Sequence, residues 1–214
     1  MTAPVALGRQ HLAPYVASFL KRFADIHIEL ELTDRFVNLA TEGFDLAIRH
    51  TNAPPETHVA WVLCQTRSIL LASPEYLARR GMPKHPSELV AHDCLLYLGS
   101  HADSWTFVHS AKKKSAEKVG VSISGSLKAN NSEVLRDALQ AGLGIGLLPD
   151  FSAATSLAAE HPLLVQVLPD WQVQGFFGNR IYALRPWSPQ VPKAVECLVE
   201  HLRDSFSGGF QAFG

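Results

Sequence analysis

The sequence predicts an α/β fold made of two doubly wound subdomains, and three observations support this prediction. Residues 26–49 and 119–148 each place a helix between two strands, and parallel strands require such a crossover. A Ser-Pro-Glu helix start at residues 73–75 separates the two segments. The chain has 214 residues and is 47% hydrophobic, which is enough to bury a large core without a disulfide or a metal.

Composition and charge exclude several classes of protein. With 19 Lys and Arg against 20 Asp and Glu the net charge is −1, whereas nucleic-acid-binding domains are usually strongly basic. No apolar run approaches the roughly 18–20 residues of a membrane span, and residues 1–9 lack the apolar region of a signal peptide. The spacing of Cys64, Cys94 and Cys197 fits neither a disulfide framework nor a metal-binding pair. We therefore expect a soluble cytoplasmic α/β protein without a cofactor.

The first elements follow from the spacing of apolar residues. Six apolar residues recur at helical spacing over residues 12–23, and Pro14 lies near the expected helix start, where a missing N–H costs little. Residues 26–32 alternate between apolar and polar, which predicts a strand with one wet face.

A short helix and a buried strand are expected next. Thr33 or Asp34 can cap a helix over about residues 34–40, and Gly43 can end it. Residues 44–49 are mostly apolar, as expected of a strand covered on both faces. Together with the preceding strand they form the first β–α–β passage.

The remaining elements are predicted from the same signals. Strands are expected at residues 59–64, 67–72, 94–98, 105–109, 119–129, 143–148, 163–168 and 180–184. Helices are expected from residue 74 onward, after Asn130 or Asn131, at residues 151–159 and at about residues 189–206. Gly142 ends the helix that the asparagines begin.

Motifs of catalysis and cofactor binding are nearly absent. The Gly-Leu-Gly-Ile-Gly run at residues 142–146 ends a helix and enters a strand, the reverse of a dinucleotide-binding fingerprint, so we interpret it as close packing of helix on strand. The ten histidines are dispersed and predict no metal site. Lysines 112–114 are expected at a solvated hairpin tip, because no aromatic residues are interleaved with them.

Polar residues gather where strands are expected to end. In open α/β sheets ligands bind beyond the carboxyl ends of strands, beside the N–H groups of helix N-termini. If the two subdomains face one another, these residues line a cleft suited to a small anionic or polar ligand. The candidate ligand-binding residues are Pro4, Val5, Ala6, Leu7, Thr33, Arg49, His50, Thr51, Asn130 and Asn131. The alternative is that the Thr and Asn residues only cap helices and that Arg49 only forms a structural ion pair.

Several short motifs, taken together, match a known family. They are APVALGR (residues 3–9), LAP (12–14), DRFVNL (34–39), EGFDLAIR (42–49), ASPEYL (72–77), AGLGIGLLP (141–149) and LPDW (168–171). In this order, which covers almost the whole chain, the sequence resembles the effector-binding (co-inducer) domain of LysR-type transcriptional regulators.

The resemblance implies a particular architecture and particular partners. Two Rossmann-like subdomains would be joined by two crossovers, as in type 2 periplasmic binding proteins, with residues 1–72 plus 178–214 in subdomain I and residues 73–177 in subdomain II. A small-molecule effector would bind between them at the candidate residues. The first helix and the 131–141 helix would pair in a homodimer, and the full-length protein would form a tetramer. DNA binding would belong to an N-terminal winged helix-turn-helix, which we expect to be absent from these 214 residues.

The favoured function is therefore ligand sensing in transcription regulation, without catalysis. A bilobal solute-binding protein for transport has the same design, but the absence of a signal peptide and the dispersed cysteines favour the cytosol. A small α/β enzyme is a further alternative, which no nucleophile–base pair in the sequence supports.

Overall fold

The chain forms two compact units. The computed structural model describes residues 1–35, 37–98, 103–110, 118–157, 160, 162–174 and 177–210. Unit 1 comprises Met1–Arg67 together with the chain from Gly178 through the last helix, and unit 2 comprises Ser68–Phe177. Residues 68–72 form a strand of the unit 2 sheet and are grouped with that unit, whereas the sequence-based division places them in subdomain I.

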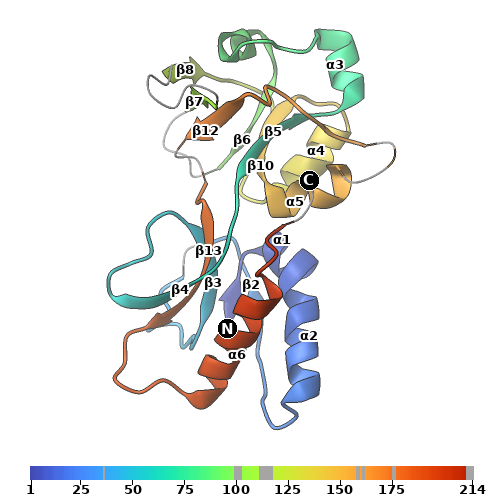
Figure 1. The fold of residues 1–214 in the computed structure, drawn as a ribbon. Coiled ribbons are helices and arrows are strands. Elements are labelled where there is room, and N and C mark those ends of the chain that lie inside the picture. Colours follow the sequence, from blue (N-terminus) through green and yellow to red (C-terminus); the bar gives the residue numbers. More distant parts are fainter. Residues whose placement is uncertain are drawn as a thin grey trace. The chain divides into compact units, whose positions relative to one another are not determined.

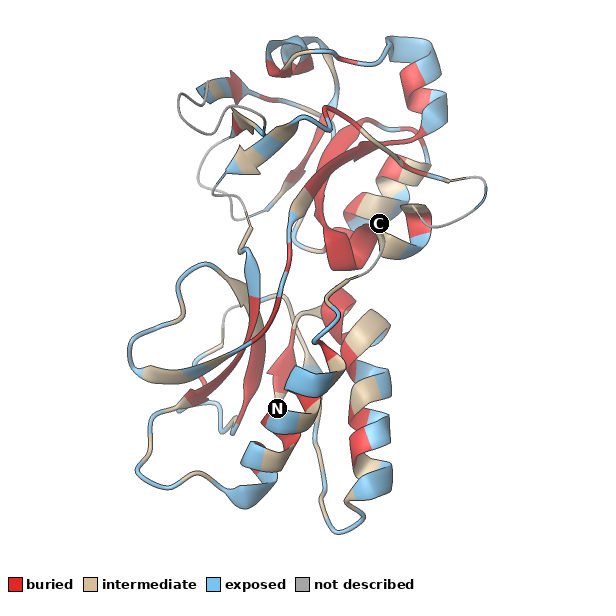
Figure 2. Cartoon of the chain, in the orientation of Figure 1, coloured by how far each residue is buried: buried red, intermediate tan, exposed pale blue. Residues whose placement is uncertain are grey.

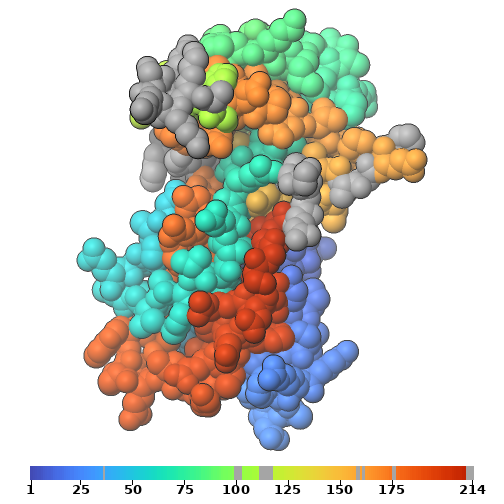
Figure 3. Space-filling model, in the orientation of Figure 1, coloured from blue at the N-terminus to red at the C-terminus, as the bar shows by residue number. Residues whose placement is uncertain are grey.

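Unit 1 is built on a mixed five-stranded sheet in the order β2-β1-β3-β13-β4 (Figure 1). Strand β1 is parallel to β2 and β3, whereas β13 is antiparallel to β3 and β4. The elements are β1 (Thr2–Ala3), α1 (Val5–Leu7), η1 (Gly8–Leu12), α2 (Ala13–Arg22), β2 (Glu31–Leu32), β3 (Ala47–Thr51), β4 (His58–Gln65), β13 (Arg180–Pro186) and α6 (Lys193–Ser205). Helices α2 and α6 lie side by side, blue and red in Figure 3, and His201 Nε2 lies 3.0 Å from the carbonyl oxygen of Tyr15.

The first helix starts earlier than expected and contains a π-helical turn. Elements α1, η1 and α2 run without a break, and the N–H of Ala13 bonds to the carbonyl of Gly8, five residues back. Pro14 therefore lies inside a continuous helix, where it has no N–H to donate, and a π turn is one way in which helices absorb such an interruption. The predicted apolar stripe is confirmed by three buried residues: Leu12, Val16 and Phe19.

Two predictions for unit 1 were wrong in extent or type. Of the strand expected at residues 26–32, only β2 is paired, because its partner β1 is two residues long. The described residues of the helix expected at 34–40 are not helical: residues 34–35 form a bend, and a turn begins at residue 39. The side-chain oxygen of Asn38 accepts hydrogen bonds from the N–H groups of Ala40 (3.2 Å) and Thr41 (3.3 Å), and such bonds compete with helical ones. Gly43 ends this turn at φ 74°.

Unit 2 contains a mixed five-stranded sheet, β11-β5-β10-β6-β9, and a three-stranded antiparallel sheet, β12-β7-β8. Strand β6 is parallel to β10 and β9, and β5 is antiparallel to β10 and β11. The elements are β5 (Ser68–Ala72), α3 (Pro74–Arg80), η2 (Pro86–Ala91), β6 (Cys94–Tyr97), β7 (Ser104–His109), β8 (Lys118–Ser122), β9 (Lys128–Ala129), α4 (Ser132–Gln140), β10 (Ile145–Pro149), α5 (Asp150–Leu157), β11 (Val165–Gln166) and β12 (Trp171–Gln174). The single strand expected at 119–129 is thus two strands, and β12 was not predicted.

The glycine-rich run packs α4 against the strands, as predicted. Gly142 ends the helix with φ 74°. A Cβ atom at Gly144 would lie 2.2 Å from the carbonyl oxygen of Asp93, and one at Gly146 would lie 3.1 Å from the side chain of Leu139. At Gly144 only glycine allows this approach to the backbone, and at Gly146 a side chain would require Leu139 of α4 to shift, so the interpretation as a packing motif is confirmed.

Each unit has its own buried core, drawn red along the strands in Figure 2. The core of unit 2 includes Trp105 and Phe107 of β7, packed with Tyr76 of α3. In unit 1 a smaller cluster joins Leu39 of the turn to Leu184 of β13. Within the described ranges no helix combines the length and the apolar character that a membrane crossing needs. Lysines 112–114 lie outside the described residues.

Candidate functional site

The neighbouring strands β2, β1 and β3 of unit 1 are parallel and aligned along the strand direction. In their register Thr2 lies opposite both Glu31 and Ala47. Extended by two positions, this register puts Pro4, Thr33 and Arg49 at one level, and the N–H of Thr33 donates to the carbonyl of Ala3 at 2.9 Å. Since adjacent strands are about 4.8 Å apart, these three backbone positions span about 10 Å. The structure thus brings together three candidate residues that are far apart in the sequence.

The helix that starts at this level has its first N–H group engaged by an acidic side chain. Pro4 is the N-cap residue of α1 and makes no side-chain cap. The N–H of Val5 donates to Asp34 Oδ1 at 3.0 Å. Ala6 and Leu7, two of the candidate residues, are buried. The sequence placed Asp34 next to a candidate residue but did not select it. A carboxylate is favourable at a helix N-terminus, but no local pattern joins two residues 29 positions apart.

Arg49, the middle residue of β3, supplies positive charge at the level where β1 and β2 end. Its half-buried guanidinium donates from Nη2 to Thr2 Oγ1 and from Nη1 to the carbonyl oxygen of Ile48, both at 3.4 Å. Burial lowers the pKa of Arg49 and the charge of Asp34 raises it, and the guanidinium remains protonated in both cases. Within the described part of the chain Arg49 forms no ion pair, so the predicted alternative of a structural ion pair is not observed there.

A second arginine nearby is neutralised by its own partner. Arg35 and Glu42 form a two-pronged ion pair, and the N–H of Asn38 donates to Glu42 Oε1 at 2.9 Å. The hydrogen bonds from Arg35 and Asn38 hold the pKa of Glu42 below its usual value. Among the residues that the structure describes, Thr33 Oγ1 accepts one long bond, 3.4 Å, from the N–H of Arg35.

His50 and Thr51 have mainly structural contacts. His50 Nε2 hydrogen-bonds to the carbonyl oxygen of Gly178, and burial lowers the pKa of His50 to about 4 although this bond raises it. The imidazole is therefore neutral at pH 7. Thr51 Oγ1 accepts a bond from the N–H of Ala53 at 3.2 Å. Both residues tie the end of β3 to its neighbouring segments.

The two asparagines belong to unit 2, where one of them is a helix cap. Asn131 Oδ1 accepts hydrogen bonds from the N–H groups of Glu133 (2.9 Å) and Val134 (3.2 Å). The side chain of Asn131 thus has the helix-capping role that the sequence allowed. Asn130 is exposed directly after β9. Among the described residues no group of three or more His, Cys, Asp or Glu is placed to hold a metal ion.

These features define the class of protein, and sequence comparison defines the family. A mixed α/β sheet in each of two units, joined by two passages of the chain, is the fold expected of a ligand-sensing regulatory domain. The family described as LysR substrate binding domain matches residues 1–207. The chain belongs to this family.

Curated relatives are named as transcriptional regulators. The chain is 30% identical over 206 residues to the probable HTH-type transcriptional regulator LtrA of Klebsiella pneumoniae, covering 96% of this chain and 64% of the relative. It is 32% identical over 166 residues to the HTH-type transcriptional activator TtdR of Escherichia coli K12, covering 77% of this chain and 51% of the relative. The chain thus spans between about half and two thirds of the length of these relatives. It is a regulatory domain and not an enzyme.

Solved structures confirm the fold class. The full-length virulence activator AphB of Vibrio cholerae matches with a TM-score of 0.78 and 30% identity, over 95% of this chain and 66% of that chain. The regulatory domain of CrgA from Neisseria meningitidis matches with a TM-score of 0.77 and 25% identity, over 95% of both chains.

Proposed function

We propose that this chain senses a small anionic or polar metabolite in a cleft between its two units and thereby controls transcription in the cytoplasm. The observation that carries the proposal is the alignment of Pro4, Thr33 and Arg49 at one level of the unit 1 sheet. There Arg49 provides a positive charge that no described carboxylate pairs within 4.0 Å. Asn130 and Asn131 would contribute amide groups from unit 2.

The unit 1 residues suit a carboxylate group of the effector. A guanidinium binds a carboxylate through two parallel hydrogen bonds, and partial burial strengthens them. Thr33 can donate its hydroxyl proton, because that oxygen accepts only one long bond from Arg35. The effector's carboxylate would thus be bound by one guanidinium and one hydroxyl.

Asp34 limits how much negative charge this site accepts. Its carboxylate engages the Val5 N–H, and its charge opposes the lowering of the Arg49 pKa by burial. An anionic effector therefore competes with Asp34 for the positive charge of Arg49. In the Asp34→Asn variant the amide oxygen can keep the bond to Val5 while the charge is removed, so we expect tighter binding of anionic effectors.

Signalling would follow from a difference in affinity between two arrangements of the protein. Only an effector that binds one arrangement more tightly can shift the equilibrium. The arrangements would differ in the orientation of the two units or of paired domains. The homodimer would form through the first helix (α2) and the 131–141 helix (α4), on which Val134 is 50% exposed. The full-length protein would be a tetramer that binds DNA through a separate N-terminal domain.

A ligand screen followed by matched variants tests the proposal. Small organic acids are screened by thermal shift and confirmed by calorimetry. Arg49→Met should weaken binding at least about tenfold, since a hydrogen bond to a charged group contributes roughly 1.5–3 kcal/mol. Thr33→Ala and Asn130→Ala should weaken it less.

The design separates binding from folding. Asn131→Ser keeps a capping oxygen for α4 and removes the amide, so a loss of affinity in this variant reports on the ligand. Arg203→Met, at an exposed position of α6, is the control for loss of one positive charge. Unchanged affinity in Arg49→Met, Thr33→Ala and Asn130→Ala, or no binding by any acid in a broad set, would refute the cleft assignment.

A further inference from the structure

Unit 1 contains a cavity of about 270 Å³ at the end of the sheet opposite to the aligned strand ends. One wall is the turn that carries Leu39, Phe44 and Asp45, just before β3. The other wall is the segment from Arg185, at the end of β13, to the first turn of α6. Because β13 is antiparallel to β3, Arg185 lies just before the start of β3, whereas Arg49 is the middle residue of that strand and lies opposite Tyr182. About three residues of strand, or about 10 Å, separate these levels.

A buried, incompletely bonded arginine lines this cavity. Arg185 is only 5% exposed, and its Nη2 donates to the carbonyl oxygen of Gln190 at 3.1 Å. Its Nη1 is buried and has no hydrogen-bond partner among the described residues, where Arg185 also forms no ion pair. A buried guanidinium without a counter-charge is unfavourable, and an unsatisfied buried donor indicates a missing partner.

The walls of the cavity are held in place by their own contacts. Ser188 Oγ donates to the same Gln190 carbonyl at 3.1 Å, and prolines 186 and 192 bracket this connection. The opposite turn is held by the side-chain bonds of Asn38 and by Glu42. A cavity with fixed walls loses little conformational freedom when it binds a ligand.

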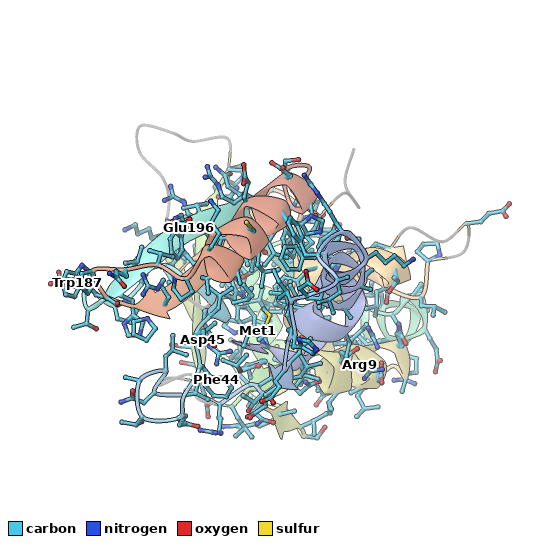
Figure 4. All side chains as sticks on the ribbon, turned by 90° about the horizontal axis from the view of Figure 1, so that it is seen from below. Met1, Arg9, Phe44, Asp45, Trp187 and Glu196 are labelled. Carbon is cyan, nitrogen blue, oxygen red and sulfur yellow. The ribbon has the colours of Figure 1, made fainter. Side chains whose placement is uncertain are left out.

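Both apolar and charged residues line the cavity. Leu39, Phe44, Pro192 and Val195 supply apolar surface around the guanidinium. Asp45 is exposed and lies beside Phe44 in Figure 4, with Met1 near it, and the N–H of Thr2 bonds to the carbonyl of Leu46 at 3.0 Å. A carboxylate at this position repels a second negative charge on a bound molecule.

We propose that this cavity is a second ligand site, which takes a small monocarboxylate with an apolar body. The carboxylate binds the guanidinium of Arg185, whose Nη1 turns toward the cavity on binding, and the apolar body packs against Phe44 and Val195. The volume lies just below the range of drug-sized pockets, so it fits an acid of about ten heavy atoms. Asp45 disfavours dicarboxylates. This site is separate from the effector site proposed above and does not depend on it.

The probe is sodium hexanoate, with hexanamide as the neutral analogue and adipate as the dicarboxylate. In a titration of the ¹⁵N-labelled chain followed by ¹H–¹⁵N spectra, hexanoate should shift the amide signals of residues 39–45 and 185–195. Hexanamide and adipate should bind at least about tenfold more weakly. Hexanamide has no charge to pair with Arg185, and the second carboxylate of adipate is repelled by Asp45.

Variants distinguish ligand binding from a structural role. Arg185→Met should weaken hexanoate binding at least about tenfold and leave the Tm of the free chain unchanged or higher, since an unpaired buried charge is removed. Ala40→Phe fills the cavity and should abolish the shifts while Arg185 remains. Arg203→Met, on the exposed face of α6, should bind as the parent does.

Three results would overturn the proposal. Equal binding of hexanamide would show an apolar cavity that does not recognise charge. Shifts confined to residues 4–7, 33 and 49, lost in Arg49→Met but retained in Arg185→Met, would place hexanoate at the proposed effector site instead. No binding by the parent chain, with a lower Tm for Arg185→Met, would assign Arg185 a purely structural role.

Discussion

The two units differ in how the first N–H groups of a helix that follows a strand are bonded. In unit 2 the helix α4 is capped by the residue that precedes it, Asn131, through two bonds to its own first turn. In unit 1 the helix α1 begins at Val5, after an N-cap residue, Pro4, that makes no side-chain bond, and its first N–H is engaged by Asp34, 29 residues away. The first solution is local and the second depends on the tertiary fold.

The difference matters for ligand binding. A local cap leaves the helix start independent of the rest of the unit. A distant carboxylate couples the helix start to Arg49, because the same Asp34 acts on both. A ligand that changes the surroundings of Asp34 therefore acts on the start of the first helix as well.

The largest expected effect concerns the close packing of Gly144, in the chain that follows α4 in unit 2. In Gly144→Ala the new Cβ would lie 2.2 Å from the backbone oxygen of Asp93, which cannot move aside as a side chain can. We expect a loss of about 3 kcal/mol in the free energy of unfolding, measured by urea denaturation. Gly120→Ala in β8, where nothing lies within 4 Å, is the matched control and should stay within about 0.5 kcal/mol. Equal losses in both variants would contradict the packing argument.

The next effect tests the buried histidine of unit 1. Burial lowers the pKa of His50 to about 4, so the unfolded chain, with a histidine pKa near 6.5, binds the proton more readily than the folded chain. Stability is thus fully present above pH 6.5 and is lost as the pH falls toward 4, by up to about 3 kcal/mol.

The His50→Gln variant should flatten this pH dependence in urea denaturation between pH 7 and 4.5. His27→Gln, at an exposed position, should keep the slope of the parent protein. A slope that is the same in His50→Gln and in the parent protein would show that the imidazole of His50 accepts a proton in the folded state.

The local cap of unit 2 should give a smaller effect. Asn131→Ala removes the acceptor for two N–H groups and should cost about 1 kcal/mol in the free energy of unfolding. Asn131→Ser, which keeps a capping oxygen, should be within a few tenths of the parent protein. If both variants lose the same free energy of unfolding, the loss does not come from the missing helix cap.

The smallest effect is expected for the distant cap of unit 1. Asp34→Asn keeps an acceptor for the Val5 N–H and removes only the charge, which contributes about 0.5 kcal/mol at a helix N-terminus. Thermal unfolding at low and high salt should show this difference shrinking as salt screens it. A loss above about 2 kcal/mol would mean that the charge of Asp34 itself stabilises unit 1.

The same contrast explains which features could be predicted from the sequence. The helix start at Ser73 and the cap at Asn131 depend on residues within three positions, and the structure confirms both. The glycines after α4 were interpreted correctly because their meaning depends on an adjacent helix and strand. Local capping and packing signals are therefore sufficient for much of unit 2.

Features that depend on distant partners could not be predicted. The turn at Asn38 resembled a helix because its apolar spacing does not reveal that the amide side chain binds the backbone. The bond of Asp34 to Val5 and the buried guanidinium of Arg185 have no local signature either. For the site, the sequence located the strand ends but not the carboxylate that shares the charge of Arg49.

The π turn of the first helix has a consequence for changes in chain length. An α-helix rotates by about 100° per residue, and η1 places five residues where an α-helical hydrogen bond spans four. The buried residues Leu7 and Leu12 are accordingly five positions apart. Deleting one residue within η1 would place Leu7 and Leu12 four positions apart, which is α-helical spacing, so the N–H groups of α1 would keep their orientation relative to the buried face of α2. At this point the helix can lose one residue without a rotation of the binding surface.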